Sequence, residues 1–399
     1  MRIAWLAPYP FHALGDVVRW ARPPTWIHPC SWIVSLSREL AARPGVELHV
    51  ISVSPRLAGT QQLVHDGIRL HAIQNGIRPF HRGFPTYCPI DVLIGFRQET
   101  ALIRRELAAV RPDIIHAHGT ESAYALAAAR SGRPAILSMQ GIITEYYKTD
   151  PCLRFWAVRY WEQRAVRALR HVTCRTRIDT GFIRRVNPGA RIFQIPEAMG
   201  PAFFRQPPWT LDAGNKTILF VGILSPRKGL HTLLRAMREV VRIESSARLQ
   251  VIGGTPADIR PYAESVRQWG LEAHVEFQGT RKSDEVAAAH RSARLFVIPS
   301  TNENSPNTLA EAMVSGMPVI ASDAGGIPSM VDDRQTGRLF PVGDEQALAR
   351  VIVELLGDGE QCVALGSTAA RVARSRHHPA HVADLTLRAY HDVLEGSPR

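Results

Sequence analysis

The sequence predicts an α/β protein of two doubly wound domains, because it is long and because strand and helix patterns alternate in two separate series. At 399 residues the chain exceeds what one hydrophobic core usually organises. Strands that alternate with helices are typical of parallel sheets with helices on both faces. In such sheets ligands bind beyond the carboxyl ends of the strands. We therefore expect two domains that face each other across a ligand-binding cleft.

Short apolar runs mark the expected strands, and apolar residues at helical spacing mark the expected helices between them. In the first series the strands are expected at 3–7, 47–53, 113–118, 135–139 and 191–195, and helices at 31–41, 91–110 and 152–170. In the second series the strands are expected at 217–222, 249–254, 274–279, 295–300 and 318–322. The Pro-rich stretch between the series is expected to be a linker. The predicted organisation is a first domain at 1–196, a linker at 197–215, a second domain at 216–375 and a helix at 376–399 that packs back on the first domain.

The composition is that of an ordinary folded protein, with 45% hydrophobic and 21% charged residues. No uncharged apolar run approaches the roughly 18–20 residues needed to span a bilayer, and the amino terminus resembles a buried strand more than a secretory signal. Five cysteines lie far apart without a CxxC pair, which favours neither a zinc site nor a disulfide framework. We expect reduced thiols and a cytoplasmic location.

The positive charge belongs to the first half of the chain. Residues 1–205 carry 27 Lys and Arg against 14 Asp and Glu, whereas residues 206–399 carry 21 against 22. A basic half can face nucleic acid, an anionic membrane or a phosphorylated acceptor, or can reflect a genome that favours arginine. Charge alone does not decide between these.

A helix start after the strand at 295–300 is the strongest candidate for a phosphate site. Ser305 and Pro306 are good N-cap and first-turn residues, so we expect Ser305 to cap a helix that begins at Pro306. The free N–H groups near Asn307 and Thr308 would then face the cleft and bind phosphate.

Two glutamates flank this helix start. Glu303 lies in the preceding loop and Glu311 about five residues inside the helix. Carboxylates accept strong hydrogen bonds from sugar hydroxyls, so the pair could bracket a nucleotide sugar. Alternatively, Glu303 is a solvated loop residue and Glu311 a charge on the helix surface.

A strand, turn and helix at 220–237 offer cations for the same ligand. Gly222 ends the strand and lets a ligand approach the backbone. Lys228 begins the helix, where its charge could neutralise a departing diphosphate, and Arg227 is a possible helper. Both cations could instead be solvated surface residues.

The strand at 113–118 ends in two histidines followed by Gly119, where the chain turns into a helix. We expect them to point to opposite faces, with His116 in a structural position and His118 in the cleft. A histidine in such a place is often a satisfied structural residue.

Aromatic and basic residues gather in two segments of the first half. Tryptophan with arginine suits a membrane interface or a sugar platform, whereas the alternative is a helix with its aromatics in the core. The two sets are Trp20, Trp26, Trp32, Arg19 and Arg22 around the first loop, and Phe155, Trp156, Tyr160 and Trp161 among the cations of 148–171.

The second half resembles the retaining glycosyltransferases of family 4, which have the GT-B fold of two Rossmann-like domains. The segment from Glu303 through NSPNTLA to Glu311 matches the family's two glutamates separated by seven residues, and the segments 312–333 and 336–349 are also similar to family sequence. The resemblance covers nearly the whole second half and is highly specific.

The resemblance implies transfer of a sugar, with retention of configuration, from a UDP- or GDP-sugar to a saccharide or lipid-linked acceptor. Glu303 would bind donor-sugar hydroxyls and Glu311 the ribose. Lys228 would contact the donor phosphate, and His118 would position the donor sugar or the acceptor. The remaining implied donor-binding residues are Gly222, Arg227, Ser305, Asn307 and Thr308.

The chain also departs from the family pattern. Ile223 stands where the family commonly has an arginine, and the usual Gly-Gly loop is replaced by a long loop that reads Ile-His-Pro at 27–29. Gln140 stands at a frequent histidine, and Glu197 followed by Ala198 at a frequent Asn-Gly.

These observations predict an enzyme of cell-surface polysaccharide or glycolipid biosynthesis. We expect no cofactor and no metal, because no Asp-x-Asp motif occurs, and no nucleic-acid partner, because no recognition motif accompanies the basic half. A contact with the anionic inner membrane surface is consistent with the aromatic and basic segments. A non-catalytic sugar-nucleotide-binding protein is the alternative, and the absence of GxGxxG after a strand argues against a Rossmann oxidoreductase.

Overall fold

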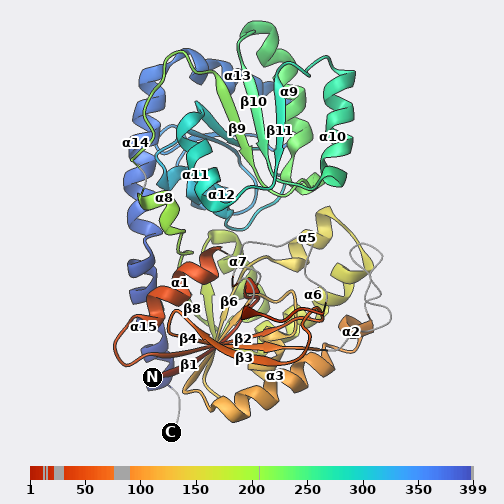
Figure 1. Cartoon of the computed structure of the whole chain (residues 1–399), viewed down its shortest axis with the longest axis vertical. Coiled ribbons are helices and arrows are strands. Elements are labelled where there is room, and N and C mark those ends of the chain that lie inside the picture. The colour runs from red at the N-terminus through yellow and green to blue at the C-terminus, as the bar shows by residue number, and fades with distance from the viewer. Residues whose placement is uncertain (12–13, 15–16, 22–30, 76–89, 206, 397–399) are drawn as a thin grey trace. The chain divides into compact units, whose positions relative to one another are not determined.

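The computed structural model describes residues 1–11, 14, 17–21, 31–75, 90–205 and 207–396, and these form two compact units, each built on its own sheet (Figure 1). Unit 1 comprises residues 1–198 and 379–399, and unit 2 comprises residues 199–378. Each unit is an α/β domain with a parallel sheet, as the alternating patterns predict.

The sheet of unit 1 has eight strands, all parallel to their neighbours except the edge strand β3, which is antiparallel to β4. In spatial order the strands are β3 (Gln61–His65), β4 (Ile68–Ile73), β2 (Glu47–Val53), β1 (Arg2–Leu6), β5 (Ile114–His118), β6 (Ala135–Ser138), β7 (His171–Cys174) and β8 (Arg191–Gln194). The predicted strands agree with five of these within a residue or two. Strands β3, β4 and β7 were not predicted.

Helices cover both faces of this sheet and enclose two hydrophobic cores. On one face pack α2 (Ile90–Leu93), α3 (Arg97–Val110), α4 (Tyr124–Ala129), α5 (Ile143–Thr149), α6 (Leu153–Ala168) and α7 (Arg177–Val186), and on the other α1 (Ser31–Ala41) and α15 (Pro379–Glu395). The single helix expected at 91–110 is divided into α2 and α3, because Gly95 and Phe96 both have a positive φ.

The carboxyl-terminal helix α15 is anchored to the centre of the unit 1 sheet. The Tyr390 hydroxyl accepts a hydrogen bond from Trp5 Nε1 at 2.8 Å and lies 2.6 Å from His116 Nδ1. Tyr390 is fully buried, so its hydroxyl needs these partners. At the helix surface Arg43 pairs with Asp384 at 2.9 Å.

Unit 2 has a six-stranded, entirely parallel sheet with a single continuous core. In spatial order its strands are β11 (Val275–Gly279), β10 (Arg248–Ile252), β9 (Thr217–Val221), β12 (Leu295–Ile298), β13 (Val319–Ser322) and β14 (Arg338–Phe340). Its helices are α8 (Pro201–Arg205), the 3-10 turns η2 (Pro226–Lys228) and η3 (Ile327–Ser329), α9 (Leu230–Ile243), α10 (Pro256–Gln268), α11 (Ser283–Ser292), α12 (Asn307–Val314), α13 (Glu345–Gly357) and α14 (Gly359–Arg376).

Most of the stretch expected to be a linker at 197–215 is part of unit 2. It contains α8, whose Phe203 is buried in the core, and Trp209, whose indole N–H donates to the Ala293 carbonyl at 2.8 Å. The expectation of a linker was therefore wrong for this stretch. Its prolines break the helical pattern, but its aromatic residues bury apolar area against the unit.

Within unit 2, His290 of α11 is a fully buried imidazole that packs against the rings of Phe203 and Phe296. Its Nδ1 lies 3.4 Å from the Ser315 hydroxyl, and its Nε2 has no hydrogen-bond partner in the described structure. Burial lowers the pKa of His290 to about 3. The folded chain therefore keeps this ring neutral at pH values where an unfolded chain protonates it.

We predict that His290 makes unit 2 less stable in mild acid. Because the folded pKa is depressed, stability is lost as the pH falls from about 6.5 toward 3, at about 1.4 kcal/mol per pH unit. Between pH 6.5 and 5 the free energy of unfolding should fall in both proteins. The fall should be about 2 kcal/mol smaller in His290→Leu than in the wild type. Urea unfolding at both pH values checks this. Equal pH dependence in the two proteins would show that the ring is not the source.

Candidate active site

The predicted residues of unit 2 lie in the segments that follow two adjacent strands, and the structure brings Lys228, Arg227 and Glu303 into contact. Strand β9 ends at Val221 and leads through Gly222 to η2, which contains Lys228. Its neighbour β12 ends at Ile298 and leads through a loop containing Glu303 to α12. Parallel strands bring their following loops to the same edge of the sheet, which is where ligands bind in such folds.

The Glu303 carboxylate is the centre of this cluster and is only 5% exposed. Its Oε1 accepts from Lys228 Nζ at 2.5 Å and from the Ser300 hydroxyl at 2.8 Å, and its Oε2 lies 3.4 Å from Arg227 Nη1. Burial by itself raises the pKa of Glu303, but the charges of Lys228 and Arg227 outweigh it and hold the pKa below its ordinary value. Glu303 is therefore a fixed, ionised carboxylate, and not a solvated loop residue.

Two glycines hold the loops around Glu303 in close contact. Gly229 has a φ of 70°, and a Cβ there would lie 1.9 Å from the Pro299 carbonyl oxygen. Gly325 has a φ of 52°, and its Cβ would lie 2.1 Å from the Glu303 carbonyl oxygen, which also accepts from the Gly326 N–H at 2.9 Å. A side chain at either position would push the loops apart. The position of Glu303 is thus set by backbone packing as well as by its ion pairs.

The start of α12 differs from the expected cap. Pro306 is the residue that precedes the helix, with a φ of −70° and a ψ of 119°, and no side chain caps the helix. The Ser305 hydroxyl instead contacts Met330 Sδ at 3.6 Å. The prediction that Ser305 is the N-cap was therefore wrong. The first-turn N–H groups of Asn307 and Thr308 still have no carbonyl one turn earlier in the helix.

The polar side chains at the start of α12 are only partly buried, so a ligand could contact them. Asn307 is half-buried, and its Oδ1 has no hydrogen-bond partner in the described structure. Thr308 is also half-buried. Glu311, the fifth residue of α12, is only 8% exposed, so it is not the helix-surface charge of the alternative interpretation.

At the end of β9, the structure does not itself require a glycine at Gly222. A Cβ there would lie 3.6 Å from the Phe220 ring, which is ordinary contact. Ile223, where the resemblance would place an arginine, is 40% exposed, and the cation that reaches Glu303 from this segment besides Lys228 is Arg227.

The two histidines of β5 lie on the same face of the unit 1 sheet, contrary to the expectation that they point to opposite faces. Their rings stack with centroids 4.0 Å apart. The expectation was wrong because side chains alternate along a strand, so residues two apart share a face. His116 is held by Tyr390 and by the Ser138 hydroxyl at 2.8 Å, which is a structural role.

His118 has a different environment. Its ring lies against Trp5 and Trp32, with centroids 4.5 and 5.7 Å away, and neither ring nitrogen has a hydrogen-bond partner in the described structure. Burial, and then the neighbouring His116 and Arg175, hold the pKa of His118 well below its usual value. The imidazole is therefore neutral, with a nitrogen free to donate and another free to accept.

A buried ion pair that the sequence reasoning did not anticipate lies in the same unit. Arg175, directly after β7, pairs with Glu197 at 2.7 Å, and both side chains are nearly inaccessible. Burial raises the pKa of Glu197 to about 7, although Arg175 opposes this. Glu197 had been noted only as a departure from the Asn-Gly pattern. The sequence signal that could have revealed the pair is a charged residue at the end of each of two neighbouring strands.

The aromatic segments are divided between core and surface. Trp32 is buried beside His118, and Trp161 donates to the Val92 carbonyl at 2.5 Å. Trp156 and Tyr160 of α6, by contrast, are 48% and 54% exposed. Trp26, Arg22 and the Ile-His-Pro segment at 27–29 lie outside the described residues.

Within the described ranges no group of three or more His, Cys, Asp or Glu side chains is placed to hold a metal ion. Nor does any helix among those residues combine the length and the apolar character needed to cross a bilayer.

Each unit matches a family model of known proteins. Residues 31–198 match the family model described as Glycosyltransferase Family 4, and residues 215–358 match the model described as Glycosyl transferases group 1. The fold is similar to that of sucrose-phosphate synthase from Thermosynechococcus elongatus (TM-score 0.82, 21% identity, all of both chains). It is also similar to that of HepE from Anabaena in complex with UDP-glucose (TM-score 0.70, 17% identity, 98% of this chain and 100% of the other). These likenesses confirm the predicted GT-B class of fold.

Two curated relatives match parts of the chain. The D-inositol 3-phosphate glycosyltransferase of Corynebacterium glutamicum is 32% identical over 45% of this chain and 44% of its own length. The phosphatidyl-myo-inositol mannosyltransferase of Mycobacterium leprae is 35% identical over 45% of this chain and 47% of its own length. The chain thus spans about half the length of the curated relatives it matches. Because the two family models match both α/β units, the chain belongs to the group 1 glycosyl transferases of glycosyltransferase family 4.

Proposed function

We propose that this chain is a retaining glycosyltransferase that moves a sugar from a UDP- or GDP-sugar to a saccharide or lipid-linked saccharide, in the synthesis of cell-surface polysaccharide or glycolipid. The observation that carries the proposal is the ionised, buried Glu303 held by Lys228 and Arg227 four residues before α12. This arrangement combines a hydroxyl acceptor, two cations and a helix N-terminus at one edge of a parallel sheet. A sugar joined to a diphosphate needs these three kinds of group.

Each part of the donor has a partner in this arrangement. Glu303 accepts hydrogen bonds from hydroxyls of the transferred sugar, and Glu311 accepts them from the ribose. The diphosphate lies against Lys228, Arg227 and the first-turn N–H groups at Asn307 and Thr308. Gly222, with no side chain, and Ser305 complete the surroundings of the donor. The relatives' names support a nucleotide-sugar donor, since HepE was solved with UDP-glucose, and a relative from Mycobacterium tuberculosis is named as a GDP-mannose-dependent mannosyltransferase.

Charge stabilisation of the leaving diphosphate is the main catalytic effect in this proposal. Cations and helix N–H groups that already point at the developing charge need no reorganisation when the bond breaks. Lys228 is held by Glu303 before any donor arrives, so its ammonium group is already oriented. Since the sequence contains no Asp-x-Asp motif, the chain's own cations take the place of a metal ion in this scheme.

His118 acts in this proposal as a positioning group for donor or acceptor hydroxyls. Because its imidazole is neutral, with both nitrogens unpartnered in the described structure, it can donate one hydrogen bond and accept another. Its strongly lowered pKa argues against a role as a proton donor near neutral pH.

We predict that the two glutamates of the site separate nucleotide binding from turnover. Glu311→Ala removes the acceptor for the ribose hydroxyls and should weaken binding of UDP or GDP by about 10–100-fold, which is the value of hydrogen bonds to a charged group. Glu303→Ala should mainly lower kcat and change nucleotide binding only a few-fold, because the released Lys228 ammonium can still pair with the diphosphate but is no longer oriented by the carboxylate. Calorimetry with UDP and GDP, followed by turnover with the donor that binds, measures both effects.

Glu345→Ala is a matched control, because Glu345 is a partly exposed glutamate of α13 in the same unit, with its Oε2 3.5 Å from Arg235 Nη1. It should change neither binding nor turnover. Wild-type activity in both site variants would falsify the assignment of the site.

The proposed enzyme works at the inner membrane surface, with α6 of unit 1 facing the lipid. Leu153, Trp156 and Tyr160, which we call the aromatic face of α6, recur at helical spacing and are 48–59% exposed. Arg164 and Arg167 continue the same exposed stripe. Aromatic side chains next to cations suit the interface of an anionic bilayer.

We predict that Trp156→Ser with Tyr160→Ser weakens binding to phosphatidylglycerol vesicles at least about tenfold, because the change removes two large apolar contacts. Vesicle co-sedimentation at low and high salt measures this, and salt should weaken the wild-type interaction. Val64→Ser changes a residue of β3 that is 66% exposed and should have no effect. If both variants bind vesicles as the wild type does, the aromatic face is not a membrane contact.

A further inference from the structure

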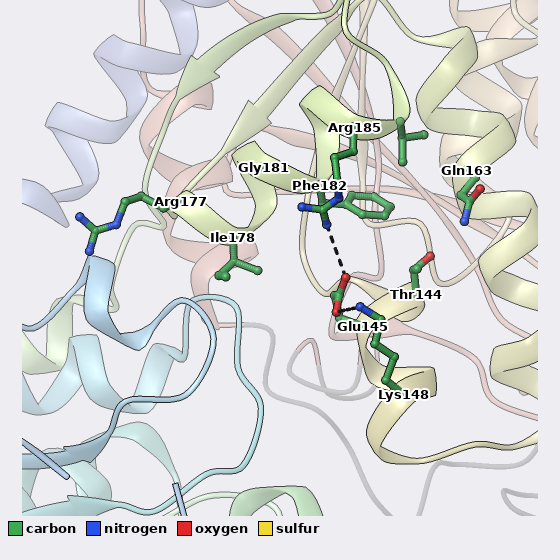
Figure 2. Close-up of a pocket in the computed structure, with 10 residues that line it drawn as sticks. Thr144, Glu145, Lys148, Gln163, Arg177, Ile178, Gly181, Phe182 and Arg185 are labelled. Atoms are coloured by element: carbon green, nitrogen blue, oxygen red, sulfur yellow. Dashed lines mark hydrogen bonds and ion pairs between the residues drawn. The ribbon is translucent and has the colours of Figure 1, made fainter. Parts of the chain in front are cut away.

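A cavity of about 530 Å³ opens between α5, α6 and α7 of unit 1, and no residue of the proposed donor site lines it. Figure 2 shows Glu145 and Lys148 of α5 facing Arg185 of α7, with Gln163 of α6 on one side and Ile178 near the start of α7. The cavity thus lies among helices that follow consecutive strands of the unit 1 sheet.

The charge of the cavity wall is positive. Lys148, Arg177 and Arg185 line the cavity, and Glu145 is the acidic residue of its lining. Glu145 Oε2 lies 2.6 Å from Lys148 Nζ, and Glu145 Oε1 lies 3.5 Å from Arg185 Nη2, so one carboxylate holds two cations in place. Lys148 and Arg185 share this one carboxylate, so the pair keeps a net positive charge, which favours an anionic ligand.

The same cavity has an apolar part. Ile178 is 40% exposed, although large aliphatic side chains are usually buried, and Phe182 below it is buried in the core. An inorganic anion would leave this side uncovered. The wall therefore suits an anion that carries an organic group.

Gly181 provides the space for such a ligand. It is the fifth residue of the ten-residue helix α7, where a glycine destabilises the helix relative to alanine. Its φ is not positive, and a Cβ there would approach only Arg185 Nη1, at 3.6 Å. Neither backbone conformation nor packing requires a glycine at this position. What the missing side chain supplies is open volume next to the cations.

We propose that this cavity binds a phosphate ester, with the phosphate between Lys148 and Arg185 and the organic part over Gly181 and Ile178. Arg177, at the other end of the cavity, adds to the positive potential that attracts the ester. The binding needs no nucleotide and no residue of unit 2, so it can succeed or fail independently of the proposed transferase activity.

The test titrates the full chain with glycerol 3-phosphate and with inorganic phosphate, without nucleotide, by calorimetry. Glycerol 3-phosphate should bind more tightly than inorganic phosphate, and Arg185→Gln should weaken its binding about tenfold or more. Gly181→Leu should abolish binding without lowering the melting temperature, since leucine favours a helix and a Cβ there makes only ordinary contact with Arg185 Nη1 at 3.6 Å. Arg104→Gln, which removes an exposed cation of α3 outside the cavity, should bind as the wild type does.

Vesicles of phosphatidylglycerol and of phosphatidylcholine distinguish a lipid headgroup from a free phosphate ester. If Gly181→Leu loses binding to phosphatidylglycerol vesicles as well, the ester belongs to a lipid. If only glycerol 3-phosphate binding is lost, the ligand is a free ester. Glycerol 3-phosphate binding by well-folded Gly181→Leu at wild-type affinity, or the absence of any Gly181-dependent binding in both assays, would overturn the proposal.

Discussion

The ion pair between Glu303 and Lys228 is the interaction on which the arrangement of unit 2 around the proposed donor depends. Each group alone would be costly to bury, and together they satisfy each other at the end of two neighbouring strands. The pair is also incomplete, because Lys228 carries three donors, and Glu303 has lone pairs left after its three contacts. In the proposed function, a sugar diphosphate adds hydrogen bonds to both groups without separating them. The cluster is ordered without a ligand and keeps donors and acceptors for the proposed donor.

The buried polar groups of unit 1 differ from the ion pair of Glu303 and Lys228 in that two of them are neutral histidines. The buried ion pair of unit 1, Arg175 with Glu197, lies directly after β7 and close after β8. Arg175 is near enough to both histidines to help hold them unprotonated. The polar groups at this edge thus form one coupled set, in which His116 is fully hydrogen-bonded and His118, among the described residues, is not. Buried polar atoms without partners are rare in folded proteins, which supports the proposed role of His118 in positioning a ligand.

Much of the fold could be predicted from the sequence, because strands buried on both faces are continuous apolar runs, such as 218–221 and 295–298. Strand β3 (Gln61–His65) was missed because it lies at the sheet edge with alternating exposure. Strand β4 was missed because Arg69 and His71 interrupt its apolar run, and β7 because it is only four residues long and two of them, His171 and Thr173, are polar. At the site, Glu303, Glu311 and Lys228 were predicted from their resemblance to family motifs, and the structure shows the contact between Glu303 and Lys228. The prediction that Ser305 caps α12 was wrong, because a proline can either precede a helix or begin one. The contacts of Ser300 and Arg175 depend on which loops meet, which local sequence does not specify.

The excess positive charge of the first half contributes little to the stability of unit 1. The function of these cations is therefore better sought in ligand binding than in folding. The cations on α5, α6 and α7 are mostly exposed, and exposed ion pairs contribute about 0–1 kcal/mol each. The cations nevertheless lie beside the aromatic face of α6 and around the cavity that Gly181 of α7 lines. Neither the backbone conformation nor the packing at Gly181 requires a glycine. This placement supports the two proposals for unit 1, a contact of α6 with an anionic membrane and a phosphate ester in the cavity beside α7, because each needs cations next to exposed apolar side chains.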